Sequence, residues 1–176
     1  MRFGRTGPSL GAIILLAIAV AALLGFELPE IGDEGDGGAG TRGGEAKAEV
    51  LRVIDGDTIE VDLDGDEEHV RYIGIDTPES AIPGEPVECF GKEAAAANED
   101  LVDGETVRLV FDAERRDRYG RLLAYVYADG TFVNARLVEA GYATTLEIEP
   151  NTSRAGRLGR LEAAAGREGE GLWGAC

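Results

Sequence analysis

The sequence predicts an α+β fold in which helices interrupt and follow a small β-barrel. Three observations support this prediction: five short segments rich in β-branched residues, an Ala- and Glu-rich segment after the third of them, and helical periodicity towards the C-terminus. Five strands with a helix inserted after the third match the strand count of an OB-type barrel. We therefore expect a five-stranded OB-fold domain with three helices.

Turn-forming residues separate the expected strands. Asp-Gly pairs at 55–56, 64–65 and 129–130 interrupt or end β-branched runs, as is typical where a chain reverses direction. The strands are expected at residues 48–54, 58–63, 68–75, 106–111 and 122–127. The helices are expected at residues 91–102, 133–140 and 151–167, the last with Asn151 or Thr152 as its N-cap.

The second and third expected strands can form a hairpin that brings distant carboxylates together. If residues 64–67 form the turn, paired residue numbers add to about 131, because antiparallel pairing fixes that sum. Asp57 then lies opposite Gly74, close to Asp76, at the open end of the hairpin. Arg71 lies on the same strand, and Glu79 follows just beyond a proline.

These residues suit a hard cation. The carboxylates of Asp57 and Asp76 and the backbone carbonyl of Thr77 are oxygen donors that Ca²⁺ or Mg²⁺ prefers and zinc does not. Two carboxylates and one carbonyl leave coordination positions for water and a substrate phosphate, as in catalytic metal sites. The competing interpretation of Asp57 is ordinary turn chemistry with Asp55.

The remaining polar residues suit a phosphodiester. Glu79 can act as a base or orient a water molecule, and Arg71 and Arg121 can bind a phosphate bidentately. Tyr119 and Arg118 are candidate substrate-binding residues beside Arg121. For Arg121 the competing interpretation is a surface ion pair with Asp117. Together the clusters predict a metal-dependent nuclease.

The motifs themselves resemble those of the thermonuclease (staphylococcal-nuclease-like) family. In family order, from about residue 50 to residue 173, the chain contains Ile54-Asp-Gly-Asp-Thr58, Arg71-x₄-Asp76-Thr-Pro-Glu79, Cys89-Phe-Gly-Lys-Glu-Ala94 and Asp117-Arg-Tyr-Gly-Arg121. The resemblance implies an OB-fold with three helices and Ca²⁺-dependent hydrolysis of DNA and RNA that leaves 3′-phosphate ends. It also implies Ca²⁺ binding by Asp57, Asp76 and Thr77 and catalytic roles for Arg71, Glu79 and Arg121.

The chain departs from the family in two respects. The family often places base-stacking tyrosines after Gly141, but residues 144–149 contain none. The formal net charge is −17, with only Lys47 and Lys92 as lysines after residue 45, a composition that suits a salt-adapted organism. We therefore expect activity to rise with salt.

A non-catalytic nucleic-acid- or protein-binding module on the same barrel is the alternative function.

The N-terminus indicates export. A basic start precedes an uncharged apolar run over residues 10–26, which as a helix would be roughly 26 Å long. The run is expected to be a membrane anchor or a cleaved signal peptide, with a terminal core helix as the remaining alternative. Residues 27–45, rich in Gly, Asp and Glu, are expected to form a tether before a monomeric domain at 46–176.

Export would permit a disulfide. Cys89 and Cys176 are the two cysteines, and an extracellular or cell-surface location allows them to pair. Two free thiols are the competing expectation, since the sequence does not fix the distance between them.

Overall fold

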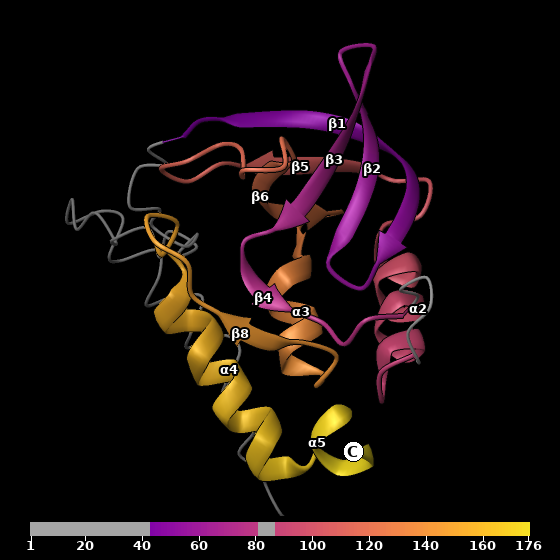
Figure 1. Ribbon diagram of the computed structural model, residues 1–176, viewed down its shortest axis with the longest axis vertical. Coiled ribbons are helices and arrows are strands. Elements are labelled where there is room, and N and C mark those ends of the chain that lie inside the picture. Colours follow the sequence, from indigo (N-terminus) through magenta and orange to yellow (C-terminus); the bar gives the residue numbers. More distant parts are fainter. Residues whose placement is uncertain (1–42, 81–86) are drawn as a thin grey trace, which may run out of the picture. The chain divides into compact units, whose positions relative to one another are not determined.

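The strand order closes the sheet on itself in the computed structural model, which describes residues 43–80 and 87–176. The sheet runs β3-β2-β1-β5-β6, and a parallel pairing of β3 with β6 completes the barrel (Figure 1). Its strands are β1 (Glu45–Asp55), β2 (Thr58–Leu63), β3 (Asp66–Tyr72), β5 (Thr106–Val110) and β6 (Leu122–Ala128). The short β7 (Thr131–Phe132) pairs antiparallel with β6. The predicted five-stranded barrel is confirmed.

Aliphatic side chains from every barrel strand form the core. Because side chains alternate between the two faces of a strand, one set from each strand points into the barrel. Each such aliphatic side chain contributes about 1.5–3 kcal/mol when fully buried. Buried members include Val50, Ile59, Val61, Val70, Val107, Leu109, Leu122 and Val126.

The helices lie together on one side of the barrel (Figure 1). The three predicted helices are present as α2 (Gly91–Val102), α3 (Val133–Glu139) and α4 (Ala155–Glu168), and a short α5 (Leu172–Ala175) follows. The predicted N-cap at Asn151 or Thr152 is wrong, because α4 begins at Ala155. The Asn151 side chain instead exchanges two hydrogen bonds with the backbone of Glu114, at 2.8 and 2.9 Å.

The hairpin between β2 and β3 is tighter than predicted. Leu63 pairs with Asp66 and Thr58 with Arg71, so the register differs by two residues from the predicted one. Asp64 and Gly65 both have positive φ values, 59° and 96°, as a two-residue hairpin turn requires. Because strand side chains repeat every two residues, the shift leaves each residue on its predicted face.

The third predicted strand is two strands. Gly74 has a φ of 80°, which ends β3 and starts β4 (Gly74–Asp76) in a new direction. This second strand leaves the barrel and pairs with β8 (Thr144–Leu146), where Asp76 lies opposite Thr144. The break therefore carries Asp76 to the rim of the barrel.

The described part of the domain begins just before the predicted boundary. The first strand starts at Glu45, and the carbonyl of Gly44 accepts a hydrogen bond from the N–H of Phe111. The predicted signal or anchor at residues 1–26 and nearly all of the predicted tether lie outside the described residues. Across residues 43–80 and 87–176, no helix has the length and apolar character needed to cross a bilayer.

Candidate active site

Asp57 is the buried centre of the site. It follows the turn between β1 and β2 and is only 5% exposed. The N–H and hydroxyl of Thr77 donate to its Oδ2 at 2.9 and 3.1 Å, and the hydroxyl of Thr58 donates to Oδ1 at 3.0 Å. A buried carboxylate requires such donors. Asp57 therefore joins the β1–β2 turn to the segment after β4.

Arg71 joins the two aspartates. Its guanidinium contacts Asp57 and donates to Oδ1 of Asp76 at 2.5 Å. Burial and the nearby charge of Arg121 lower the pKa of Arg71, although Asp76 and Glu79 oppose the shift. An arginine remains charged even so. The structure thus brings Asp57, Arg71, Asp76 and Thr77 together.

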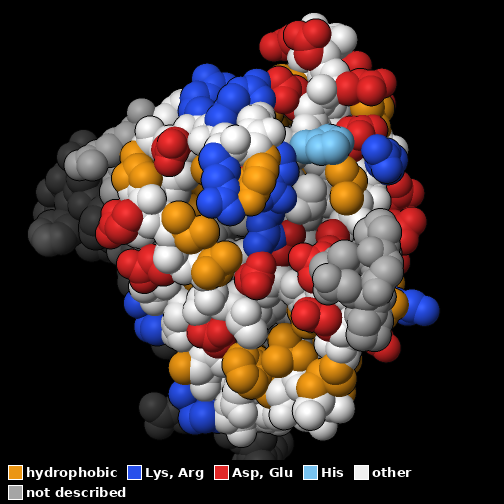
Figure 2. Space-filling view, viewed as in Figure 1, with side chains coloured by type: hydrophobic (Ala, Val, Ile, Leu, Met, Phe, Trp, Pro, Cys, Tyr) orange, Lys and Arg blue, Asp and Glu red, His pale blue; other side chains and the backbone are white. Residues whose placement is uncertain are grey.

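Glu79 and Arg121 line a cavity together with Asp57 and Arg71. The cavity has a volume of about 300 Å³ and is lined by Ile54, Asp55, Asp57, Thr58, His69, Arg71, Glu79 and Arg121. On the face that Figure 2 shows, a band of Lys and Arg side chains ends beside a group of Asp and Glu side chains, and the single histidine lies next to them. Asp57 and the three predicted catalytic side chains therefore line one cavity, while Asp76 is joined to it through Arg71 and Thr77 through Asp57.

The carboxylates of the site are crowded. A hydrogen bond shared with Asp55, partial burial and the charges of Asp55 and Asp76 raise the pKa of Glu79, while Arg71 acts in the opposite direction. Asp57 adds a further carboxylate to the same cavity. This surplus of negative charge fits a hard divalent cation. Among the residues that the structure describes, no three His, Cys, Asp or Glu side chains group closely enough to hold a metal alone.

Asp117 shapes the loop that carries Arg121. Its Oδ1 accepts the N–H groups of Tyr119 and Arg121 at 2.9 and 3.0 Å, and its Oδ2 accepts Nε of Arg121 at 2.7 Å. Although burial acts the other way, these hydrogen bonds keep the pKa of Asp117 below its usual range. The ion pair between Arg121 and Asp117, which was the competing interpretation of Arg121, is present. Arg121 nevertheless also lines the carboxylate cavity.

A second, more apolar cavity lies next to the first. Its volume is about 500 Å³, and Arg71 lines both cavities. Tyr119, 69% exposed, stands at this second cavity with the guanidinium of Arg118 4.7 Å from its ring centre. The apolar wall consists of Leu123, Leu146 and Ile148. The structure thus places Arg118 and Tyr119 beside the predicted phosphate position and outside the carboxylate cavity.

Two supporting residues were not among the predicted site residues. Asn98 is fully buried on α2, accepts the hydroxyl of Tyr72 at 2.9 Å and donates to the carbonyl of Asp55 at 3.0 Å. Asp55 lines the same cavity as Glu79, and its hydrogen bond and charge raise the pKa of Glu79. The four-residue spacing of Ala94, Asn98 and Val102 would have placed Asn98 on the buried face of the helix.

Known proteins match this chain over most of its length. The family model described as Staphylococcal nuclease homologue matches residues 69–175. A thermonuclease of Staphylococcus hyicus is 36% identical over 163 residues, which cover 93% of this chain and 95% of the relative. A thermonuclease of Staphylococcus intermedius is 39% identical over 79% of this chain and 82% of the relative.

The chain belongs to the staphylococcal nuclease family. A further member, Endonuclease YncB of Bacillus subtilis, is 47% identical over 103 residues, which cover 57% of this chain and 49% of that protein. As a member of this family, the protein is a nuclease, a hydrolase that acts on phosphodiester bonds. Nucleic acid is accordingly its substrate.

Proposed function

We propose that the protein is an exported, Ca²⁺-dependent nuclease that cleaves DNA and RNA and leaves 3′-phosphate ends. The observation that carries this proposal is the position of Arg71, which forms ion pairs with Asp57 and Asp76 and lines one cavity with Asp57, Glu79 and Arg121. Carboxylates and guanidinium groups at one point supply both halves of phosphodiester chemistry.

Asp57, Asp76 and the Thr77 carbonyl would hold the calcium ion. All three are hard oxygen donors, and the crowding that raises the pKa of Glu79 indicates a site with spare negative charge. A bound divalent ion would polarise a phosphoryl oxygen and offset charge that develops in the transition state.

The arginines would bind the phosphate. Each guanidinium has five N–H donors in a planar fork, so Arg71 can retain one carboxylate and still donate to a phosphate oxygen. Arg121 uses Nε on Asp117, which leaves its terminal nitrogens for the same phosphate. Fixed donors directed at an oxyanion provide the largest single contribution to many hydrolytic reactions.

Glu79 would accept the proton of the attacking water. As the water oxygen bonds to phosphorus, the bond from phosphorus to the 5′-oxygen breaks. That oxygen takes a proton from the solvent, and Glu79 later returns its proton to the solvent. The products are a 3′-phosphate and a 5′-hydroxyl. The hydrogen bond with Asp55 raises the pKa of Glu79, so its carboxylate is a stronger base than that of an ordinary glutamate.

Export is the part of the proposal that rests on the sequence. The apolar run at residues 10–26 follows a basic start, and a disulfide between Cys89 and Cys176 would be stable outside the cytoplasm. We therefore place the nuclease domain at the cell surface or in the medium.

Plasmid cleavage by the purified protein tests the proposal. We expect nicking with Ca²⁺, none with a calcium chelator, and 5′-hydroxyl and 3′-phosphate ends on the products. Removal of a general base or an oxyanion donor costs about 10²–10⁴-fold in rate, so Glu79→Gln and Arg71→Ala should each show losses of that order. Glu99→Gln, at an exposed position on α2, is the matched control.

Two outcomes would contradict the proposal. Undiminished nicking in chelator would remove the calcium site. Nucleic-acid binding without cleavage under every metal condition would instead support the non-catalytic binding module.

A further inference from the structure

Both backbone polar groups of Glu79 are held by one residue. The N–H of Glu79 donates to Oε2 of Glu88 at 3.0 Å, and the N–H of Glu88 donates to the carbonyl of Glu79 at 3.1 Å. The two residues are nine positions apart in the sequence, so these hydrogen bonds join two chain segments that lie outside the barrel strands. Glu79 lies beyond the end of β4 at Asp76, so pairing between strands does not hold its backbone in place.

The residue after Glu88 is attached to the C-terminus. Cys89 and Cys176 form a disulfide with Cα atoms 6.0 Å apart. The C-terminal end is itself fixed, because the N–H of Leu172 donates to the carbonyl of Gly141 at 2.9 Å. Glu88 is therefore anchored from a second direction, through the covalent bond that its neighbour Cys89 forms with Cys176.

The start of α2 closes the arrangement from a third side. The N–H of Gly91 donates to the carbonyl of Glu88 at 3.1 Å. A Cβ atom at Gly91 would lie 2.4 Å from the carbonyl oxygen of Glu79, closer than real Cβ contacts come. The helix thus packs directly on the backbone of Glu79, and only glycine allows this approach.

We propose that Glu88, together with the Cys89–Cys176 disulfide, is a positioning device for the Glu79 carboxyl. This inference rests on the proposed role of Glu79 as the base. Glu88 is exposed, so its hydrogen bond adds little to folding stability. Its effect is on geometry: a catalytic group misplaced by 1 Å can lose about 10²-fold in rate. The Glu88 carboxylate accepts the backbone N–H of Glu79, so Glu88 acts through Glu79 and is a positioning residue.

Steady-state kinetics of three variants test the inference. Glu88→Ala removes the acceptor for the Glu79 N–H and should lower kcat about tenfold, while KM changes less than about twofold because the arginines are untouched. Glu88→Gln keeps an oxygen that accepts the same hydrogen bond and should restore most of kcat. Glu99→Ala, which removes an exposed carboxylate elsewhere on α2, should match the wild type.

A double-variant cycle separates this inference from the proposed function. If Glu88 acts through Glu79, Glu88→Ala should cause no further loss in a Glu79→Gln protein. An equal loss in both backgrounds, or unchanged kcat in Glu88→Ala alone, would overturn the positioning role and leave Glu79 as the base. Full activity of Glu79→Gln would overturn the proposed base itself.

The disulfide provides an independent arm. Cys89→Ser with Cys176→Ser should lower kcat in the same direction as Glu88→Ala, at a temperature where circular dichroism shows the variant folded. If that variant does not fold, the Glu88 variants decide the question alone, since they retain the disulfide. A folded double-serine variant with wild-type kcat would remove the disulfide from the device.

Discussion

At the scale of single residues, the site is governed by the burial of one carboxylate. Asp57 is enclosed and receives donors from Thr58, Thr77 and Arg71. Asp76 by contrast is more than half exposed, with a side-chain accessibility of 54%. Removal of a partner from a buried charge is far more costly than loss of an exposed pair. Substitution of Asp57 therefore threatens folding as well as activity, and Glu79 is the safer residue to test.

Asp55 alters the titration of the Glu79 carboxyl. Its pKa is raised chiefly by the hydrogen bond with Asp55, so in the metal-free protein the carboxyl should titrate above an ordinary glutamate. A base must be ionised, so kcat/KM should fall as pH drops through the pKa that Glu79 has in the active protein. Asp55→Asn removes a charge and the shared proton, and the titration should move to lower pH.

Carbon-13 NMR of the Glu79 carboxyl in the presence of chelator provides the measurement, with a glutamate-containing model peptide as the reference. A Glu79 titration that coincides with that of the peptide, or that does not respond to Asp55→Asn, would contradict the contact between the two acids.

At the scale of elements, local signals predicted what lies within an element, and tertiary contacts decided how elements join. The α2 helix has its predicted bounds because a glycine precedes its alanine run and Asp103-Gly104 ends it. The hairpin register could not be predicted, because Asp64-Gly65 allows both a two-residue and a longer turn. The start of α4 was missed because the Asn151 side chain bonds to Glu114, a residue distant in sequence.

The same distinction holds for the site. Asp57, Arg71 and Asp76 were identifiable from spacing, since they lie on or next to one hairpin, and Arg121 was identifiable from its own motif at 117–121. The Asn98 link and the Glu88 contact were not identifiable, because each joins segments that only the folded chain brings together.

The Cys89–Cys176 disulfide should raise the free energy of unfolding. It connects residues 87 positions apart. In the chain-entropy model a loop of that size contributes about 4 to 5 kcal/mol to the free energy of unfolding. Cys89→Ser with Cys176→Ser should therefore lower the urea midpoint markedly and steepen the slope, because the unfolded chain without the cross-link exposes more surface. Reduced wild-type protein should unfold like the variant, and oxidised and reduced proteins of equal stability would show that no such cross-link forms.

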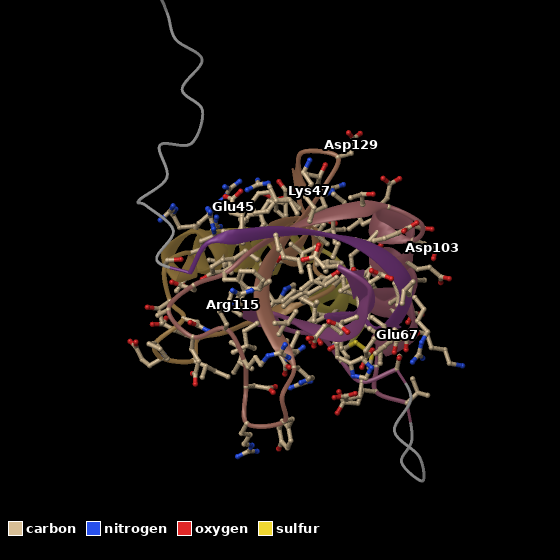
Figure 3. The ribbon with its side chains drawn as sticks, turned by 90° about the horizontal axis from the view of Figure 1, so that it is seen from above. Glu45, Lys47, Glu67, Asp103, Arg115 and Asp129 are labelled. Atoms are coloured by element: carbon tan, nitrogen blue, oxygen red, sulfur yellow. A yellow bond between two sulfur atoms is a disulfide. The ribbon has the colours of Figure 1, made fainter. Side chains whose placement is uncertain are left out.

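At the scale of the whole molecule, negative charge is spread widely and positive charge is local. Glu45, Glu67, Asp103 and Asp129 project outward from different edges of the domain (Figure 3). The net charge of −17 would repel a polyanion at long range. Arginines 115, 116, 118 and 121 instead share one loop beside the site. The molecule therefore opposes the approach of its substrate and attracts it only on contact.

This opposition predicts an unusual salt dependence. The Debye length falls from about 30 Å at 0.01 M salt to about 3 Å at 1 M, so long-range repulsion is screened well before direct ion pairs are lost. The kcat/KM for DNA should therefore rise with KCl over a range in which an ordinary phosphate-binding protein loses about 10³–10⁵ in affinity. Asp66→Asn with Glu67→Gln, two exposed acids on the β2–β3 hairpin, should raise the low-salt rate and flatten the dependence. Because those side chains do not line the carboxylate cavity, a change in the high-salt rate would indicate a different cause. A steady decline in kcat/KM from low to molar KCl would show that contact pairs, and not the overall charge, control the encounter.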